Sequence, residues 1–306
     1  MENNIVAQSN DLILATYSMS TKEKQVLLSC ISQIDSRPDA SKINKQTKFV
    51  VTVEQIRNVF YKNSYDRNLY RDLRDASKRL FSREVTIKLD DRKELLTRFV
   101  SGVLFDPDAS NVTITFAEDI LPYLTQLKAN FTKYKLIEIS ELTSTHAIRL
   151  YELIVCWTGQ YQYSKTMDLD DFRYVMGVSG MYKQFGQLKE FVINKAIAEI
   201  NDNTVYKVSV DYRKVGRSYS SLTFKFHKKA LAKLEEKDGK LSDEKIDSIV
   251  RTEQFVADYN NYHRLSYNGK MNTDSFRREM KDYLRTYPDE FTKRPLEGYL
   301  KPIKRG

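Results

Sequence analysis

Hydrophobic and polar positions follow a similar order twice along the chain. Each copy begins with apolar residues at helical spacing, continues with a short helix and a longer helix with one polar face, and ends in alternating, strand-like segments. The first copy begins near Ser20 and the second near Ser140, an offset of about 120 residues that exceeds the 20 to 50 residues of solenoid repeats. A helix-turn-helix followed by a hairpin is a winged helix, so the pattern predicts tandem, pseudo-duplicated winged-helix domains of the α+β class.

The third helix of the first copy, expected from Asp66 onward, combines an apolar stripe with a basic face. The apolar positions are Leu69, Leu73, Ala76 and Leu80. The opposite side carries Arg67, Arg71, Arg74 and Lys78. Because a helix turns 100° per residue, these four cations share one face, which suits the phosphates of a nucleic acid. The alternative is a solvated face on which Asp72 and Asp75 neutralise part of the charge.

The third helix of the second copy is expected from Tyr182 to Asn201. Its buried stripe would be formed by Leu188, Val192, Ala196 and Ile200. The outward candidates for DNA contact are Lys183, Gln184, Gln187, Lys189 and Asn194. A lysine can reach guanine, and Gln or Asn can pair with adenine through two hydrogen bonds, so these residue types suit base edges as well as phosphates. The alternative is again an ordinary solvated face.

A basic turn follows this helix. Apolar and aromatic residues alternate over residues 206–212 and again over 222–226, as in two paired strands. Arg213, Lys214 and Arg217 lie around Gly216 at the turn between them. A hairpin tipped by three cations is predicted to be a wing that contacts the DNA backbone.

The remaining pattern divides the chain into three segments. In the first copy, strands are expected at residues 49–53, 85–89, 96–105 and 112–116. A connecting helix is expected between Ala117 and Tyr134, with an apolar side formed by Ile120, Leu121, Leu124 and Leu127. We therefore predict an N-terminal winged-helix domain at 1–133, a C-terminal winged-helix domain at 134–230 and a charged extension at 231–306.

The extension has little apolar content. One helix is expected over residues 246–255 and another over 276–284, with a turn at Asn268 and Gly269. A segment with so few apolar residues is predicted to be a helical or partly disordered tail that folds on a partner or packs weakly on the second domain. The sequence indicates no role for it.

Composition narrows the class of protein. The chain has 306 residues and a formal net charge of +9, which favours a polyanionic partner without separating DNA from RNA or an acidic membrane surface. No apolar run approaches the length of a membrane span, and residues 1–10 are polar, so we expect a cytoplasmic protein with no membrane partner. Cys30 and Cys156 lie in apolar helical stretches and are expected to be buried, reduced thiols.

The patterns of common catalytic and metal sites do not occur in this sequence. His146, His227 and His263 are far apart, so the paired-histidine metal motif of DNA-nicking enzymes is missing. The glycines form no GxxxxGK loop for a nucleotide phosphate. Asp168, Asp170 and Asp171 are expected to cap the start of a helix rather than to bind a metal. We therefore expect no enzyme activity, no cofactor and no metal.

Several short motifs, in their order and spacing, resemble the replication-initiator (Rep) proteins of iteron-containing bacterial plasmids. The resemblance covers roughly residues 10–228. Its motifs are Asn10-Asp11-Leu12-Ile13 with Thr21, Glu23 and Leu27; Leu121-Pro122-Tyr123-Leu124 with Phe131-Thr132 and Tyr134; Arg149-Leu150-Tyr151-Glu152-Leu153; Glu199-Ile200-Asn201; and Gly216-Arg217 with Phe224 and Phe226. The segment after Lys237 departs from many members of this family.

The resemblance implies a function that composition and spacing alone do not give. It implies that the first domain mediates homodimerisation and touches DNA, and that the second reads direct repeats, the iterons, at a replication origin. It also implies that monomers open the strands, that dimers repress, and that a host initiator and a replicative helicase are recruited. Our hypothesis is a non-enzymatic initiator of plasmid-type (theta) replication. The alternatives are a transcriptional autorepressor and a nicking rolling-circle initiator.

Overall fold

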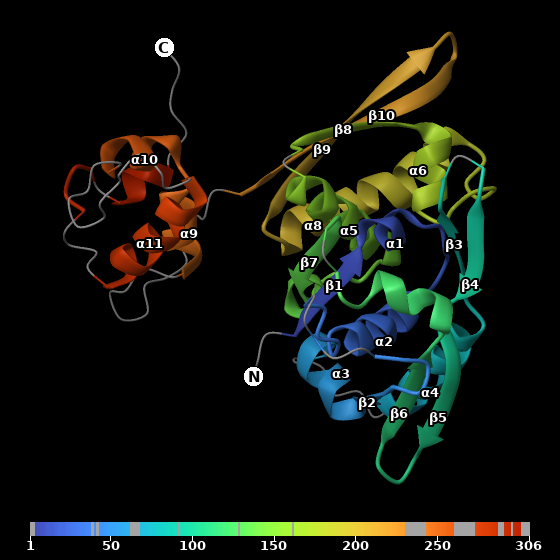
Figure 1. The fold of residues 1–306 in the computed structure, drawn as a ribbon. Helices are drawn as coiled ribbons and strands as arrows, with labels where there is room; N and C mark the ends of the chain where they lie inside the picture. Colours follow the sequence, from blue (N-terminus) through green and yellow to red (C-terminus); the bar gives the residue numbers. More distant parts are fainter. Residues whose placement is uncertain are drawn as a thin grey trace. The chain divides into compact units, whose positions relative to one another are not determined.

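The computed structural model describes residues 4–37, 40, 43–61, 68–90, 92–127, 129–160, 162–229, 243–259, 273–286, 291–294 and 296–300. The chain forms two compact units, residues 1–228 and 229–306 (Figure 1). The first unit contains both predicted winged helices. The second contains the whole of the predicted extension, residues 231–306.

The first winged helix has the predicted order of elements. Its parts are α1 (Asn10–Leu14), α2 (Thr21–Ile31), β2 (Lys48–Thr52), α3 (Val53–Phe60), α4 (Leu69–Phe81), β3 (Glu84–Lys88), β4 (Glu94–Arg98), β5 (Val100–Asp106) and β6 (Asn111–Phe116). At the start of α2, Ser20 and Glu23 form a capping box in which each side chain accepts a hydrogen bond from the other residue's backbone N–H. Strands β2, β6 and β5 form one antiparallel sheet, and β3 pairs with β4.

One of the predicted strands of this domain is two strands. Residues 96–105 were expected to be continuous, but β4 ends at Arg98 and β5 begins at Val100. Phe99 between them is buried, and β4 pairs with β3 while β5 pairs with β6. The chain therefore changes sheets at this buried aromatic residue. As a result, the first winged helix contains the additional hairpin β3–β4.

The prediction of a connecting helix between Ala117 and Tyr134 is wrong. The described residues of this segment form a short 3₁₀ helix, Glu118–Tyr123, followed by strand β7 (Phe131–Lys135) and a second 3₁₀ helix, Leu136–Ile139. Pro122 has no backbone N–H to donate to a longer helix. Gln126 and Asn130 adopt positive φ angles of 48° and 52°, which a continuous right-handed helix excludes.

The second winged helix repeats the order of the first. Its parts are α5 (Thr145–Gly159), β8 (Ser164–Asp168), α6 (Leu169–Val175), α7 (Phe185–Leu188), a π-helical segment (Lys189–Asn194), α8 (Lys195–Asn203), β9 (Tyr206–Val215) and β10 (Ser218–Lys228). Strand β8 was not predicted, yet it holds the place of β2 in the duplication and pairs with β10, which pairs with β9. In Figure 1 the hairpins β5–β6 and β9–β10 project from opposite ends of the first unit.

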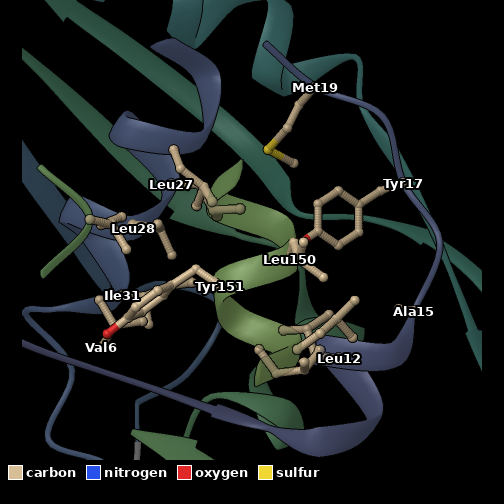
Figure 2. Close-up of a cluster of buried hydrophobic side chains, with 14 of the residues drawn as sticks. Val6, Leu12, Ala15, Tyr17, Met19, Leu27, Leu28, Ile31, Leu150 and Tyr151 are labelled. Carbon is tan, nitrogen blue, oxygen red and sulfur yellow. The ribbon is translucent and has the colours of Figure 1, made fainter. Parts of the chain in front are cut away.

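The two winged helices share one hydrophobic core. Strand β1 (Ile5–Ser9) pairs antiparallel with β7, the last strand before the second winged helix. Figure 2 shows Leu150 and Tyr151 of α5 beside Leu12, Leu27 and Leu28 of the first winged helix, all buried. The predicted domain boundary between residues 133 and 134 falls inside β7 and stays a prediction.

A buried cluster of charged side chains lies within this shared core. Lys24 Nζ on α2 is 2.9 Å from Glu152 Oε2 on α5, and Arg149 Nη1 is 3.5 Å from the same oxygen. Tyr134 and Gln8 both donate hydrogen bonds to Glu152 Oε1, at 2.8 and 3.2 Å. Burial alone would raise the pKa of Glu152, but the positive charges of Lys24 and Arg149 outweigh it and hold the pKa below its usual value.

The cluster continues to the linker between α1 and α2. Lys24 and Arg149 each donate to the Tyr17 hydroxyl at 2.7 Å, and Arg149 also donates to the carbonyls of Ala15 and Val175. Gly177 follows α6 with φ +65°, and a Cβ there would lie 1.9 Å from the Tyr17 carbonyl oxygen. The linker thus lies directly against the second winged helix, which fixes the relation of the two domains.

The second unit has a hydrophobic cluster of its own. It contains α9 (Asp243–Val250), α10 (Glu253–Tyr259), α11 (Thr273–Thr286) and a 3₁₀ helix, Leu296–Leu300. The single helix predicted over 246–255 is two helices, because Thr252 Oγ1 accepts a hydrogen bond from Phe255 N and starts a new one. The predicted turn at Asn268 and Gly269 lies outside the described residues. The cluster is formed by Ile246, Ile249, Val250, Phe255, Tyr259, Met280, Leu284, Phe291 and Tyr299.

Candidate nucleic-acid interface

The first candidate surface is the outer face of α4. The predicted stripe of Leu69, Leu73, Ala76 and Leu80 is buried, which turns Arg71, Arg74 and Lys78 to the outside, where all three are exposed. The Arg74 guanidinium lies 5.3 Å from the centre of the Phe105 ring on β5. Arg67, the fourth predicted contact, lies outside the described residues. Within the part of the chain that the structure describes, these three cations form no ion pair.

The neighbouring charges of α4 have structural partners instead. Lys22 Nζ lies 2.6 Å from Asp72 Oδ2, so this carboxylate pairs with α2 and not with the basic face. Arg79 and Arg83 both bind the buried carboxylate of Glu23, at 2.8 and 2.6 Å. Burial tends to raise the pKa of Glu23, and the hydrogen bonds from Arg83 and Arg79 outweigh burial, so the pKa is lowered. The basic face and the structural ion pairs of α4 are therefore separate groups of residues.

The second candidate surface starts in a turn rather than in a helix. The helix expected from Tyr182 begins at Phe185, because Tyr182 adopts φ +47° and interrupts the right-handed conformation. Lys183 and Gln184 therefore precede the helix, with Gln184 as its N-cap residue. Both are exposed, as are Gln187, Lys189 and Asn194. The five predicted residues therefore lie on the turn before α7 and on the exposed side of the helix that follows it.

A π-helical segment lies in the middle of this surface. The buried residues Leu188, Val192, Ala196 and Ile200 are spaced four apart, and in an ideal α-helix of 3.6 residues per turn such a row drifts around the axis. The wider turn at Lys189–Asn194 reduces this drift, so the whole row stays in the core. The sequence spacing was visible beforehand, but the π-helical segment was not predicted from it.

The predicted wing is the hairpin β9–β10. Its turn lies at Gly216, which has φ +62°, and at Arg217. Arg213 and Lys214 belong to the end of β9, and all three predicted wing cations are exposed. Among the described residues none of them forms an ion pair. Sequence reasoning missed Phe185, Tyr212 and Tyr219, which join this hairpin to the helix. The alternation of β9 predicted only that Tyr212 packs within its domain.

The three aspartates considered as metal ligands lie at the start of α6. Asp168 is the N-cap residue of α6 but makes no capping hydrogen bond, and Asp170 and Asp171 lie in the first helical turn. Across the described part of the chain, His, Cys, Asp and Glu side chains form no group of three that could hold a metal ion. No described helix has the length and apolar character needed to cross a bilayer. Cys30 and Cys156 are buried free thiols, as predicted, and burial raises the pKa of both.

Comparisons with known proteins agree with this architecture. A family model described as "Initiator Replication protein, WH1" matches residues 5–155, and one described as "Initiator Rep protein, WH2" matches residues 168–226. A replication initiation protein of Escherichia coli is 24% identical over 260 residues, which cover 82% of this chain and 80% of that protein. The PI protein of Escherichia coli is 25% identical over 190 residues, 51% of this chain and 62% of that protein.

A solved structure shares the fold. The crystal structure of the Pi initiator protein in complex with iteron DNA matches with a TM-score of 0.61 at 20% identity, over 75% of this chain and 99% of that one. The fold is therefore that of a tandem winged-helix protein. Because the two family models together match more than half of the chain, the chain belongs to the family of initiator replication proteins. Neither model extends beyond residue 226, so the second unit lies outside both.

Proposed function

We propose that this protein initiates plasmid-type (theta) replication by binding direct repeats in the duplex DNA of an origin through both winged helices. The observation that carries the proposal is the same in each domain. The third helix, together with the turn that precedes it in the second domain, presents exposed polar and cationic residues. Within the described residues no carboxylate pairs with Arg71, Arg74, Lys78, Lys183 or Lys189. Cations that are not neutralised internally are available to phosphates. Membership of the initiator family supports DNA as the polyanion.

The roles of the two domains are part of the proposal. The N-terminal domain dimerises and adds DNA contacts through Arg67, Arg71, Arg74 and Lys78. The C-terminal domain reads the repeats through Lys183, Gln184, Gln187, Lys189 and Asn194, and its wing places Arg213, Lys214 and Arg217 against the backbone. The protein acts by binding in the bacterial cytoplasm, without catalysis, and a host initiator and helicase complete strand opening. A nicking activity would appear as magnesium-dependent cleavage of supercoiled origin DNA.

Footprinting on the replicon's own origin tests the proposal. We expect protection over tandem repeats of about 20 base pairs, the length that the resemblance to iteron-binding initiators implies when each domain occupies one major groove and the two grooves lie one helical turn apart. The matched control is the same DNA with the repeats scrambled. Absence of protection over direct repeats would contradict the proposal. Replication of the origin in cells that lack the protein would indicate a repressor with the same fold.

Four single substitutions test the division between base and phosphate contacts. Lys183→Ala and Gln187→Ala should weaken binding to the repeats by about 5- to 150-fold, since a good base contact contributes about 1–3 kcal/mol, and should change binding to random DNA much less. Arg71→Ala and Lys78→Ala should weaken both by similar factors, since phosphate contacts position the protein without reading sequence. Equilibrium titration of cognate and random duplexes measures both quantities.

The control for these variants is Lys45→Ala. Lys45 is an exposed cation whose Nζ lies 3.2 Å from Glu118 Oε2, so it is already neutralised. Its removal should leave both affinities within about twofold, the scale expected when no phosphate contact is lost. Equal losses on cognate and random DNA for all four test variants would show that Lys183 and Gln187 do not read bases.

A further inference from the structure

Three aromatic rings join the wing of the second domain to the start of its third helix. Phe185, the first residue of α7, stacks on Tyr219 of β10 with ring centres 3.8 Å apart and an interplanar angle of 17°. The same Phe185 ring meets Tyr212 of β9 edge-on at 5.3 Å. Tyr212 and Tyr219 are themselves 6.1 Å apart. One ring from the helix is therefore held between both strands of the hairpin.

Two of the predicted DNA-contacting lysines lie on these rings. Lys189 Nζ is 5.0 Å from the centre of the Tyr212 ring, and Lys214 Nζ is 4.5 Å from the centre of the Tyr219 ring. Burial raises the pKa of Tyr212 to about 12, so its ring stays neutral beside the lysine. An ammonium group is attracted to the face of such a ring. The rings therefore orient one cation of the helix and one of the wing.

The outer part of the wing has little other support. Strand β8 pairs with β10 only from Ser221 to Lys225, so beyond Ser221 the hairpin consists of two strands. The register of β9 and β10 also shifts between Tyr219 and Ser221, where a third strand ends. An isolated two-stranded hairpin is marginally stable in water. The tip carries Arg213, Lys214 and Arg217, all exposed, and Val215 is 65% exposed.

We propose that Phe185, Tyr212 and Tyr219 are positioning residues that fix the wing against the third helix before DNA binds. The inference rests on the proposed function in taking duplex DNA as the ligand. With the wing fixed, the helix and the wing cations meet the groove and the backbone as one rigid surface. A wing that is already ordered in the free protein loses little conformational entropy when DNA binds, so affinity increases without a new contact. Without the rings, the outer wing moves independently of the helix.

Substitution of Tyr219 tests the inference in the free protein first. Tyr219→Ala removes the stacked ring, and Tyr219→Phe is the matched control that keeps the ring. We expect backbone amides of residues 212–219 to exchange hydrogen at least tenfold faster in the alanine variant and within twofold in the phenylalanine variant. Exchange in the buried part of β10, at Leu222 and Phe224, should be unchanged, which shows that the domain remains folded. Unchanged exchange at the wing in Tyr219→Ala would overturn the proposal.

DNA binding gives a second readout. A plot of log affinity against log salt has a negative slope. In the triple variant Arg213→Ala/Lys214→Ala/Arg217→Ala, the magnitude of this slope should decrease by about 2.7, since each lost phosphate contact contributes about 0.9. Tyr219→Ala and Phe185→Ala should move the slope toward that of the triple variant, and combining Tyr219→Ala with the triple variant should add little. A wild-type slope in both single variants would overturn the proposal. The slope is measured on random as well as repeat DNA. If the protein did not recognise the repeats, the proposed function would be contradicted, but the slopes on random DNA would still test the role of the rings.

Discussion

Glu152→Ala should lower the free energy of unfolding by about 3–5 kcal/mol, the usual cost of leaving a buried charge without its partner. Glu152 is fully buried and is the carboxylate shared by Lys24 and Arg149. Its removal would leave both cations inside the core that joins the two winged helices. Urea unfolding followed by circular dichroism measures the change. Glu118→Ala is the control, because the ion pair of this exposed carboxylate among the described residues is with exposed Lys45, and its loss should change stability little.

The same carboxylate gives the stability a pH dependence of known sign. The pKa of Glu152 is lower in the folded protein than its usual value, because Lys24 and Arg149 outweigh the effect of burial. The stabilisation is therefore complete above the unfolded pKa, about 4.3, and is lost as the pH falls through the lower folded pKa. Glu152→Ala should remove part of the loss of stability that the wild type shows in acid. A variant as stable as the wild type at neutral pH would show that the cluster does not hold the domains together.

Affinity for the origin repeats should fall at least a thousandfold when salt rises from 50 to 200 mM, if about six of the proposed cations meet phosphates. The exposed candidates on α4, on the helix from Phe185 and on the wing are enough to supply that number. Each neutralised phosphate releases counterions, so the logarithm of affinity falls linearly with the logarithm of salt. Fluorescence anisotropy at several salt concentrations gives the slope.

Gln187→Ala is the matched control for this titration. It removes a neutral side chain, so it should weaken cognate binding without changing the slope, whereas Arg71→Ala should reduce the slope by about 1. An affinity that is nearly independent of salt would contradict a phosphate-contacting surface on either domain.

Much of the tandem architecture could be predicted because its helices are amphipathic. The stripe from Leu69 to Leu80 and the row from Leu188 to Ile200 mark buried faces by spacing alone, and both are buried in the structure. A buried face fixes which residues point outward, so exposure of Arg71, Lys78, Gln187 and Asn194 followed directly. The spacing of apolar residues identifies the exposed face of a helix, but it carries no information about which exposed residues meet bound DNA.

What the sequence did not show depends on tertiary contacts. Strand β8 reads Ser-Lys-Thr-Met-Asp and has no apolar alternation, so only its pairing with β10 makes it a strand. Lys24 and Arg149 look like surface residues until Glu152 and the Tyr17 hydroxyl provide partners inside the core. The rings of Phe185, Tyr212 and Tyr219 come from three elements whose contact no periodicity reveals.

The motifs that carry the family resemblance are mainly structural. Arg149 and Glu152 belong to the buried cluster, and Glu199 accepts hydrogen bonds from the backbone of Thr143 and Ser144 ahead of α5. Asn201 exchanges two hydrogen bonds with the backbone of Val208. These residues maintain the two-domain framework, whereas the candidate DNA contacts lie outside the motifs, apart from Arg217. The resemblance thus identified the family through its scaffold.

Among the described residues, the cluster of Ile246, Phe255, Tyr259 and Met280 is built from side chains of the second unit, residues 229–306. A stop codon after Lys228 would delete one complete core and leave every member of the other in place. Truncation alleles of this kind can therefore separate loss of origin recognition from loss of whatever the last quarter of the chain supplies.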